Sequence, residues 1–135
     1  MKQVNKEGFE YYNPNSHKCG DCVVRAIVKV TEKSWYQVFD ELCAIARKMQ
    51  YMPNDMETMK KYLTQQGFRW VSVKPARGER RKTIADFVQM SKENPKARYV
   101  VRVSHHVAPV MDGKLYDLSD CSWCAVYGYF VRDGI

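Results

Sequence analysis

A cysteine, a histidine and an aspartate stand along this chain in an order that suits nucleophilic catalysis. Cys22 follows a turn-forming Gly20-Asp21 pair and begins a mostly apolar run, which predicts a thiol at the N-terminus of a helix. The unpaired backbone N–H groups and the positive end of the helix dipole favour thiolate over thiol there. His106 and Asp117 follow far downstream, in a stretch with strand-like alternation. These residue types predict a cysteine nucleophile that forms a thioester with help from a histidine base.

The predicted secondary structure that positions these residues changes from helix to strand along the chain. The hydrophobic period is helical in the first half and changes to two after residue 98. The predicted fold class is therefore α+β, with N-terminal helices packed on a C-terminal antiparallel β-sheet. Residues up to about 18 are expected to form an irregular or extended arm. Four helices are predicted: over 22–30, from a Ser34/Gln37 capping box to before Pro53, from Asn54 to Gly67, and from a Thr83/Asp86 capping box to Asn94. Strands are predicted over 68–73, 99–103, 107–111, 114–118 and 125–131.

One predicted hairpin determines which candidate residues can lie on the same face of the sheet. Asp112-Gly113 predicts a two-residue turn whose flanking residues pair with each other. Opposed side chains share a face of the sheet, so His106 and Asp117 become diagonal neighbours on one face. His105 lies on the other face, opposite Asp120. Parity permits both dyads, and we expect His106 with Asp117 because both lie nearer the turn, where the register is better specified.

The expected chemistry follows from this arrangement. His106 would take the Cys22 proton and return it to the leaving amine, while Asp117 fixes the imidazole tautomer. The backbone N–H of Cys22 is one candidate donor to an oxyanion, and a side-chain amide of the upstream arm, that of Asn15 or Asn13, is the other. The predicted site thus has Cys22, His106 and Asp117 as catalytic residues and Asn15 as an auxiliary residue, with no metal and no cofactor.

Residues 20–26 (GDCVVRA) and 106–117 (HVAPVMDGKLYD) resemble the papain-like cysteine peptidase superfamily. The likeness is greatest to small bacterial and phage proteins related to the peptidase domains that remove double-glycine leaders from bacteriocins. It spans most of the chain in order and spacing, although only these short motifs are specific. It implies a papain-like fold, with Cys22 as nucleophile, His106 as base and Asp117 as orienting acid acting on a peptide, isopeptide or other amide bond. The superfamily usually places a glutamine about six residues before the cysteine, where this chain has Ser16, and Asn15 is the nearest substitute.

Length and composition indicate a single domain over residues 1–135. A hydrophobic content of 45% with 13% aromatic residues argues against disorder. No apolar run approaches about 20 residues and no charged-then-apolar leader opens the chain, so neither a membrane span nor a secretion signal is expected. The five cysteines are an odd number, which predicts free thiols in a reducing cytoplasm rather than a disulfide framework.

Three other functions remain open at this level. The net charge of +7 permits nucleic-acid binding, although the basic residues are densest over 74–82, where we expect a solvated loop. Such a nucleic-acid-binding domain could be stabilised by a zinc held by two C-x₂-C pairs, but these pairs lie far apart in sequence: Cys19, Cys22, Cys121 and Cys124. A redox dithiol at Cys19 and Cys22 would need a preceding strand that the pattern does not predict. A catalytically inactive papain-like module that binds a peptide or protein partner is the third alternative.

Overall fold

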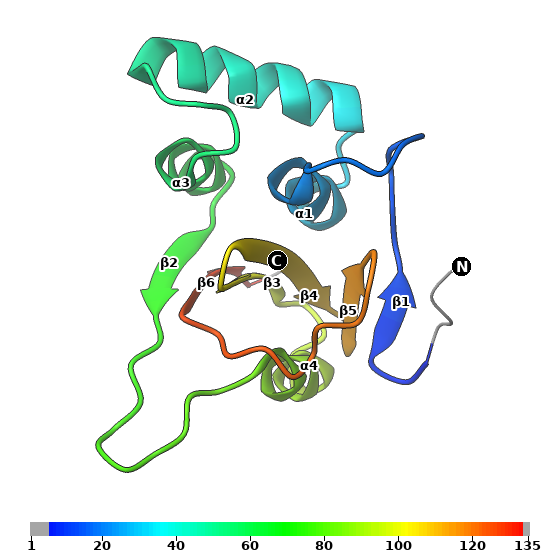
Figure 1. Ribbon diagram of the computed structural model, residues 1–135, viewed down its shortest axis with the longest axis vertical. Coiled ribbons are helices and arrows are strands. Elements are labelled where there is room, and N and C mark those ends of the chain that lie inside the picture. The colour runs from blue at the N-terminus through cyan, green and yellow to red at the C-terminus, as the bar shows by residue number, and fades with distance from the viewer. Residues whose placement is uncertain (1–5, 134–135) are drawn as a thin grey trace.

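The computed structural model describes residues 6–133, which form a six-stranded mixed sheet between two layers of helices (Figure 1). This confirms the predicted α+β class. The helices are α1 Cys22–Thr31, α2 Trp35–Met49, α3 Met56–Gln65 and α4 Ile84–Glu93. The strands are β1 Phe9–Tyr11, β2 Arg69–Ser72, β3 Arg98–Val103, β4 His106–Met111, β5 Lys114–Asp117 and β6 Gly128–Arg132.

The sheet order is β1-β5-β4-β3-β6-β2, and β1 runs parallel to β5 while every other pair is antiparallel. The prediction of a purely antiparallel C-terminal sheet is therefore wrong at one edge. The predicted irregular arm contains β1, whose residue Tyr11 pairs with Asp117. This strand has three residues, too few to show an alternating pattern, and the exposed edge of β5 decides its conformation. The part of the arm before residue 6 lies outside the described residues.

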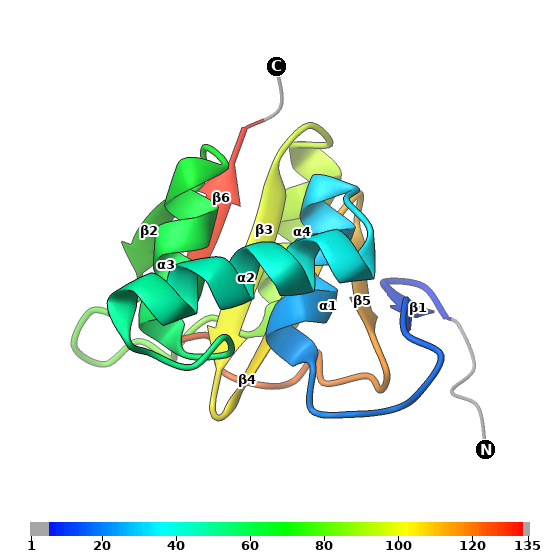
Figure 2. The same cartoon turned by 90° about the horizontal axis from the view of Figure 1, so that it is seen from above.

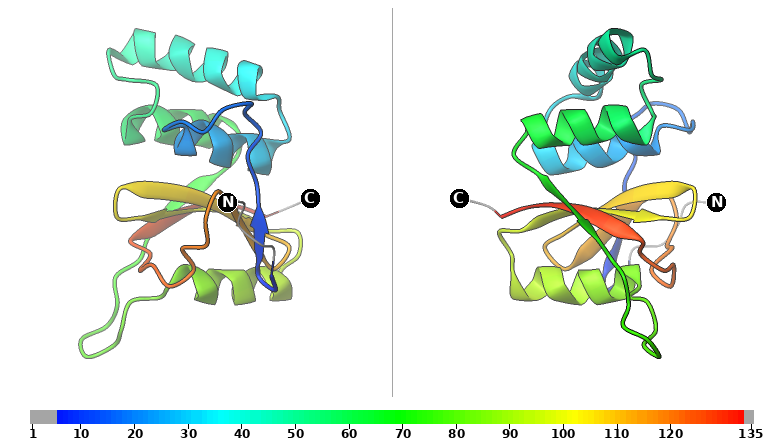
Figure 3. Two further views of the ribbon diagram at one scale, coloured as in Figure 1. Left: turned by 45° about the vertical axis from the view of Figure 1, so that its right-hand side comes forward. Right: turned by 90° about the vertical axis from the view of Figure 1, so that its left-hand side faces the viewer.

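Helices α1 and α3 cover one face of the sheet, with α2 packed on their outer side, and α4 covers the other face (Figures 2 and 3). Residues Ala26, Ile27 and Val30 of α1 are fully buried against the sheet. On the opposite face, the ring of Phe87 from α4 meets the rings of Tyr99 and Tyr129 edge to face. Helix α1 packs directly on β4. This contact places the N-terminus of α1 against the first residues of β4.

Two of the predicted helix starts are confirmed. Helix α1 begins at Cys22, and α4 begins after a complete capping box formed by Thr83 and Asp86. The start of α3 was misplaced by one residue, because the side chain of Asp55, and not that of Asn54, accepts the N–H of Glu57.

Helix α2 has only half of the predicted capping box. The Ser34 hydroxyl accepts the N–H of Gln37, as expected. The Gln37 side chain donates instead to Glu41, one turn further along the helix. A carboxylate acceptor on the same face competes successfully with the backbone group that the box would satisfy.

The basic stretch over 74–82 forms an exposed loop between β2 and α4, as predicted (Figure 1). Within it, Arg81 donates to the carbonyl of Val73 and lies over the ring of Tyr127. Among residues 6–133, no helix is both long enough and apolar enough to cross a bilayer.

Candidate active site

A proline interrupts the hydrogen bonding between β4 and β5 close to the candidate residues. The turn at Asp112 and Gly113 pairs Met111 with Lys114, as predicted, and the β4–β5 ladder then ends at the Val110–Leu115 pair. Hydrogen-bonding residues alternate along an antiparallel strand, so the nitrogen of Pro109 would be the next to face β5. Because proline has no N–H, that hydrogen bond cannot form, and the β4–β5 ladder leaves a gap toward His106 and Asp117.

The N-terminus of α1 presents its thiol to this gap. By the same alternation, the N–H of Val107 faces the gap and not β3, and it donates to the sulfur of Cys22. The Asp21 side chain does not cap α1, so its carboxylate leaves the first N–H groups of the helix uncovered. The thiol therefore lies beside free backbone donors at the positive end of the helix dipole, as the sequence predicted.

His106 links this thiol to a buried carboxylate. Its Nε2 lies 2.6 Å from Oδ2 of Asp117, and its ring also hydrogen-bonds to the Cys22 thiol. Asp117 is 3% exposed, and its Oδ1 accepts the N–H of Leu118 at 2.7 Å. Cys22, His106 and Asp117 thus form one hydrogen-bonded chain across the gap between α1, β4 and β5.

A buried arginine binds the aspartate end of this hydrogen-bonded chain. Arg25, 5% exposed, donates to Asp117 Oδ1 at 3.1 Å and to Asp21 Oδ1 at 2.5 Å. The other Asp21 oxygen accepts the indole N–H of Trp35 at 2.9 Å. All three ionised groups lie in the interior, where a charge is tolerated only with a well-placed partner. Arg25 therefore fixes α1 to the end of β5.

The charges around the thiol favour an ion pair. Burial raises the pKa of the Cys22 thiol, but the His106 hydrogen bond, the Val107 N–H and the positive charges of His106 and Arg25 hold this pKa below its ordinary value. The hydrogen bond to Asp117, with smaller contributions from the hydrogen bonds to Cys121 and Cys22, raises the pKa of His106 to about 12. Both directions favour a thiolate and an imidazolium at neutral pH.

A hollow of about 190 Å³ opens beside the thiol. Cys22, His106 and Val107 form its floor. Asn54, from the segment between α2 and α3, and Arg102 of β3 form part of its rim. The hollow is large enough for a small side chain and the peptide bond next to it.

The structure places Asn15 away from this hollow. Its side-chain amide donates to the sulfur of Cys19 at 3.2 Å and to Asp21 Oδ2 at 3.3 Å. Both of its N–H groups are therefore occupied, and Asn15 is not among the described residues that line the hollow. Among the described residues that line the hollow, Asn54 has the one side-chain amide.

The alternative dyad of His105 and Asp120 does not form. His105 is exposed in the tight β3–β4 turn with a φ of 56°. The Asp120 carboxylate instead pairs with the ammonium of Lys6 and accepts the N–H of Ser122. The parity argument left both dyads open, and the structure brings together only His106 and Asp117.

The four thiols of the zinc alternative do not converge within the described part of the chain. Cys19 is exposed beside Asn15, whereas Cys22 contacts His106. Between residues 6 and 133, the one group of three potential metal ligands consists of His106, Asp117 and Cys121, with their ligand atoms within 4.8 Å of one another. The Cys121 sulfur lies 3.7 Å from Asp117 Oδ2, and burial raises the pKa of this thiol, which disfavours the thiolate that a metal requires.

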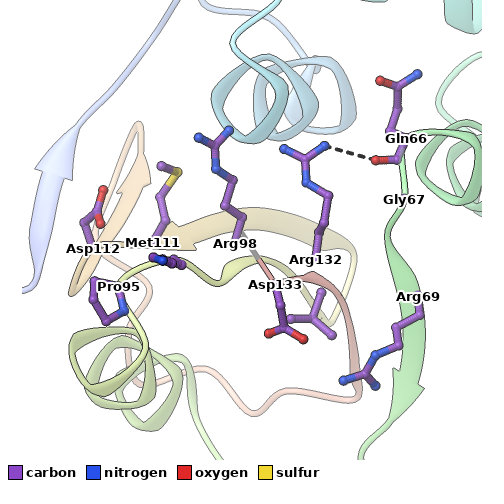
Figure 4. A pocket seen from close by; sticks show the side chains of 11 residues that line it. Gln66, Gly67, Arg69, Pro95, Arg98, Met111, Asp112, Arg132 and Asp133 are labelled. Carbon is purple, nitrogen blue, oxygen red and sulfur yellow. Dashed lines mark hydrogen bonds between the residues drawn. The ribbon is translucent and has the colours of Figure 1, made fainter. Parts of the chain in front are cut away.

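A larger hollow of about 960 Å³ lies at the other end of the sheet and has different chemistry (Figure 4). Its two central arginines serve the ends of helices: Arg98 donates to the carbonyl of Val30, and Arg132 donates to that of Gln66. These contacts complement the negative ends of α1 and α3. No cysteine or histidine is among its described lining residues.

Sequence reasoning missed three residues of the site region. Arg25 was available as a signal, because a charged residue interrupts an apolar helical run four residues after an aspartate. Asn54 was interpreted as a helix cap, and Arg102 only fell within the strand predicted over 99–103. Neither has a local pattern that would indicate its position, because the hollow is assembled from segments distant in sequence.

Comparisons of this chain with protein-family models, with curated proteins and with solved structures give no match.

Proposed function

We propose that this protein is a papain-like cysteine hydrolase that cleaves a peptide, isopeptide or other amide bond through a thioester at Cys22. One observation carries the proposal: the thiol, the His106 imidazole and the Asp117 carboxylate form a continuous hydrogen-bonded chain at a helix N-terminus. The order and roles of these groups are those of a nucleophile, a general base and an orienting acid.

In the acylation step, the Cys22 thiolate attacks the carbonyl carbon and forms the C–S bond. The oxygen that becomes negative is stabilised by uncovered N–H groups at the start of α1. When the intermediate collapses, the C–N bond breaks and the His106 imidazolium gives its proton to the leaving amine. In the deacylation step, neutral His106 removes a proton from water, which attacks the thioester, breaks the C–S bond and releases the carboxylic acid. An amine in place of water would give acyl transfer.

The test is acylation by p-nitrophenyl acetate. We expect a burst of about one p-nitrophenolate per chain followed by slower turnover, with the acetyl group on Cys22 by peptide mapping. Cys22→Ala should abolish the burst, whereas Cys43→Ala, at a half-buried thiol on α2, should retain it. Acetylation of another cysteine in the folded wild type would contradict the proposal.

The same experiment addresses an inactive module that only binds a partner. The position of Asn15 favours this second function, because both N–H groups of its amide are occupied by Cys19 and Asp21. An inactive module would accept one acetyl group without turnover, since it would lack the machinery that activates water. Sustained turnover in the wild type excludes it.

A further inference from the structure

One cation on the rim of the Cys22 hollow has no counter-ion. Arg102 is exposed, and no carboxylate among residues 6–133 lies within ion-pair distance of its guanidinium. The described lining of the hollow contains no aspartate or glutamate. The buried acids of the site, Asp21 and Asp117, are already paired with Arg25. The accessible wall beside the nucleophile is therefore positively charged without compensation.

The strand register directs Arg102 toward the thiol. Arg102 is paired with Val107 on β4, and paired residues project from the same face of a sheet with Cβ atoms about 5 Å apart. Val107 packs with α1 in the core and its N–H donates to the Cys22 sulfur. On the other side of Arg102, the residue in register is Gly128, and the ring of Trp70 fills the space above it. The open side of Arg102 is therefore the side of the hollow.

We propose that Arg102 forms a subsite for a carboxylate next to the bond that Cys22 attacks. This inference rests on the proposed function and names its substrate class: peptides with an acidic side chain, or a free C-terminal carboxylate, beside the scissile bond. A guanidinium binds a carboxylate through two parallel N–H donors, and the small volume of the hollow places that carboxylate close to the reacting carbonyl.

The first test compares two alkylating reagents of similar size, iodoacetate and iodoacetamide. At about pH 9.5, above the ordinary thiol pKa of about 8.5, Cys22 reacts whether or not its thiol is activated. In both reactions the sulfur forms a bond to carbon and iodide leaves, so the ratio of the two rates isolates the effect of the reagent's charge. We expect Arg102→Gln to lower the iodoacetate-to-iodoacetamide ratio about threefold, and Arg102→Glu to lower it further.

The matched control is Arg77→Gln, which removes the same charge from the exposed loop between β2 and α4. Its ratio should equal that of the wild type. An equal fall in both variants, or no fall in Arg102→Gln, would overturn the carboxylate subsite. The acylation burst described above would be unaffected by that result, so failure of the subsite and failure of the nucleophile are distinguished. All the variants change exposed residues, and thermal unfolding checks that each is folded.

A second set of reagents identifies the source of the carboxylate. N-bromoacetyl-glycine has a terminal carboxylate, N-bromoacetyl-glutamic acid amide has a side-chain carboxylate, and N-bromoacetyl-glycinamide has neither. Faster alkylation of Cys22 by the first reagent indicates a C-terminal residue, and faster alkylation by the second indicates an acidic side chain. Equal rates for all three would contradict the proposal.

Discussion

A His106→Ala variant will form the acyl-enzyme about 10³–10⁴ times more slowly than the wild type at neutral pH. Two effects of the imidazole are lost together. The variant has no group to protonate the leaving amine. The pKa of the Cys22 thiol also moves upward, because burial, which raises it, is no longer opposed by the His106 hydrogen bond and charge. Stopped-flow measurement of single-turnover p-nitroaniline release from an acyl p-nitroanilide, whose leaving group is an amine, gives the rate.

His105→Ala provides the discriminating comparison for this prediction. The two histidines are adjacent, but His105 lies in the exposed turn whereas the ring of His106 bonds to Asp117. The thiol pKa of Cys22 should stay low in His105→Ala and rise in His106→Ala, as measured from the pH dependence of alkylation. If His105→Ala raised the thiol pKa as much as His106→Ala, the assignment of the base would be wrong.

Arg25→Met will lower the free energy of unfolding by about 3–5 kcal/mol. The substitution keeps a side chain of similar length in a 5% exposed position, so packing changes little. It leaves Asp21 and Asp117 as buried carboxylates without their shared guanidinium. The loss comes mainly from Asp21, which keeps no cationic partner, while Asp117 keeps only His106. Urea denaturation monitored by tryptophan fluorescence measures it.

Two further variants separate burial of charge from loss of an ion pair. Arg80→Met removes an exposed pair with Asp86 at 3.5 Å and should cost about 0–1 kcal/mol. Adding Asp21→Asn to Arg25→Met removes the carboxylate that is left without a cation, so much of the stability should return. A loss in Arg25→Met no larger than in Arg80→Met would contradict the role of Arg25.

Local sequence signals predicted those parts of the fold in which neighbouring residues decide the conformation. Cys22 at a helix start, the Thr83/Asp86 capping box and the turn at Asp112 each depend on backbone groups within four residues. The pairing of β1 with β5 depends on an edge more than a hundred residues away, about which three residues of strand carry no information.

The candidate site likewise contains residues that local sequence signals predicted and residues that they did not. A parity argument allowed His106 to pair with Asp117, because one turn fixes the register of both strands, and their nearness to that turn favoured them over His105 and Asp120. That argument extended the ladder beyond Pro109, whereas the observed ladder ends before it, and the two side chains meet across the opening instead. The buried Arg25 pairs and the Arg102 rim required the packing of α1 on the sheet, which no local pattern encodes.

The pH dependence of Cys22 alkylation by iodoacetamide, resolved by peptide mass spectrometry, tests the central claim most directly. The account predicts a midpoint below the ordinary thiol pKa of about 8.5, since the thiol pKa is lowered. It also predicts a plateau through the alkaline range, because the His106 imidazolium persists until pH approaches about 12. A Cys22 midpoint at or above 8.5 would contradict the thiolate–imidazolium pair.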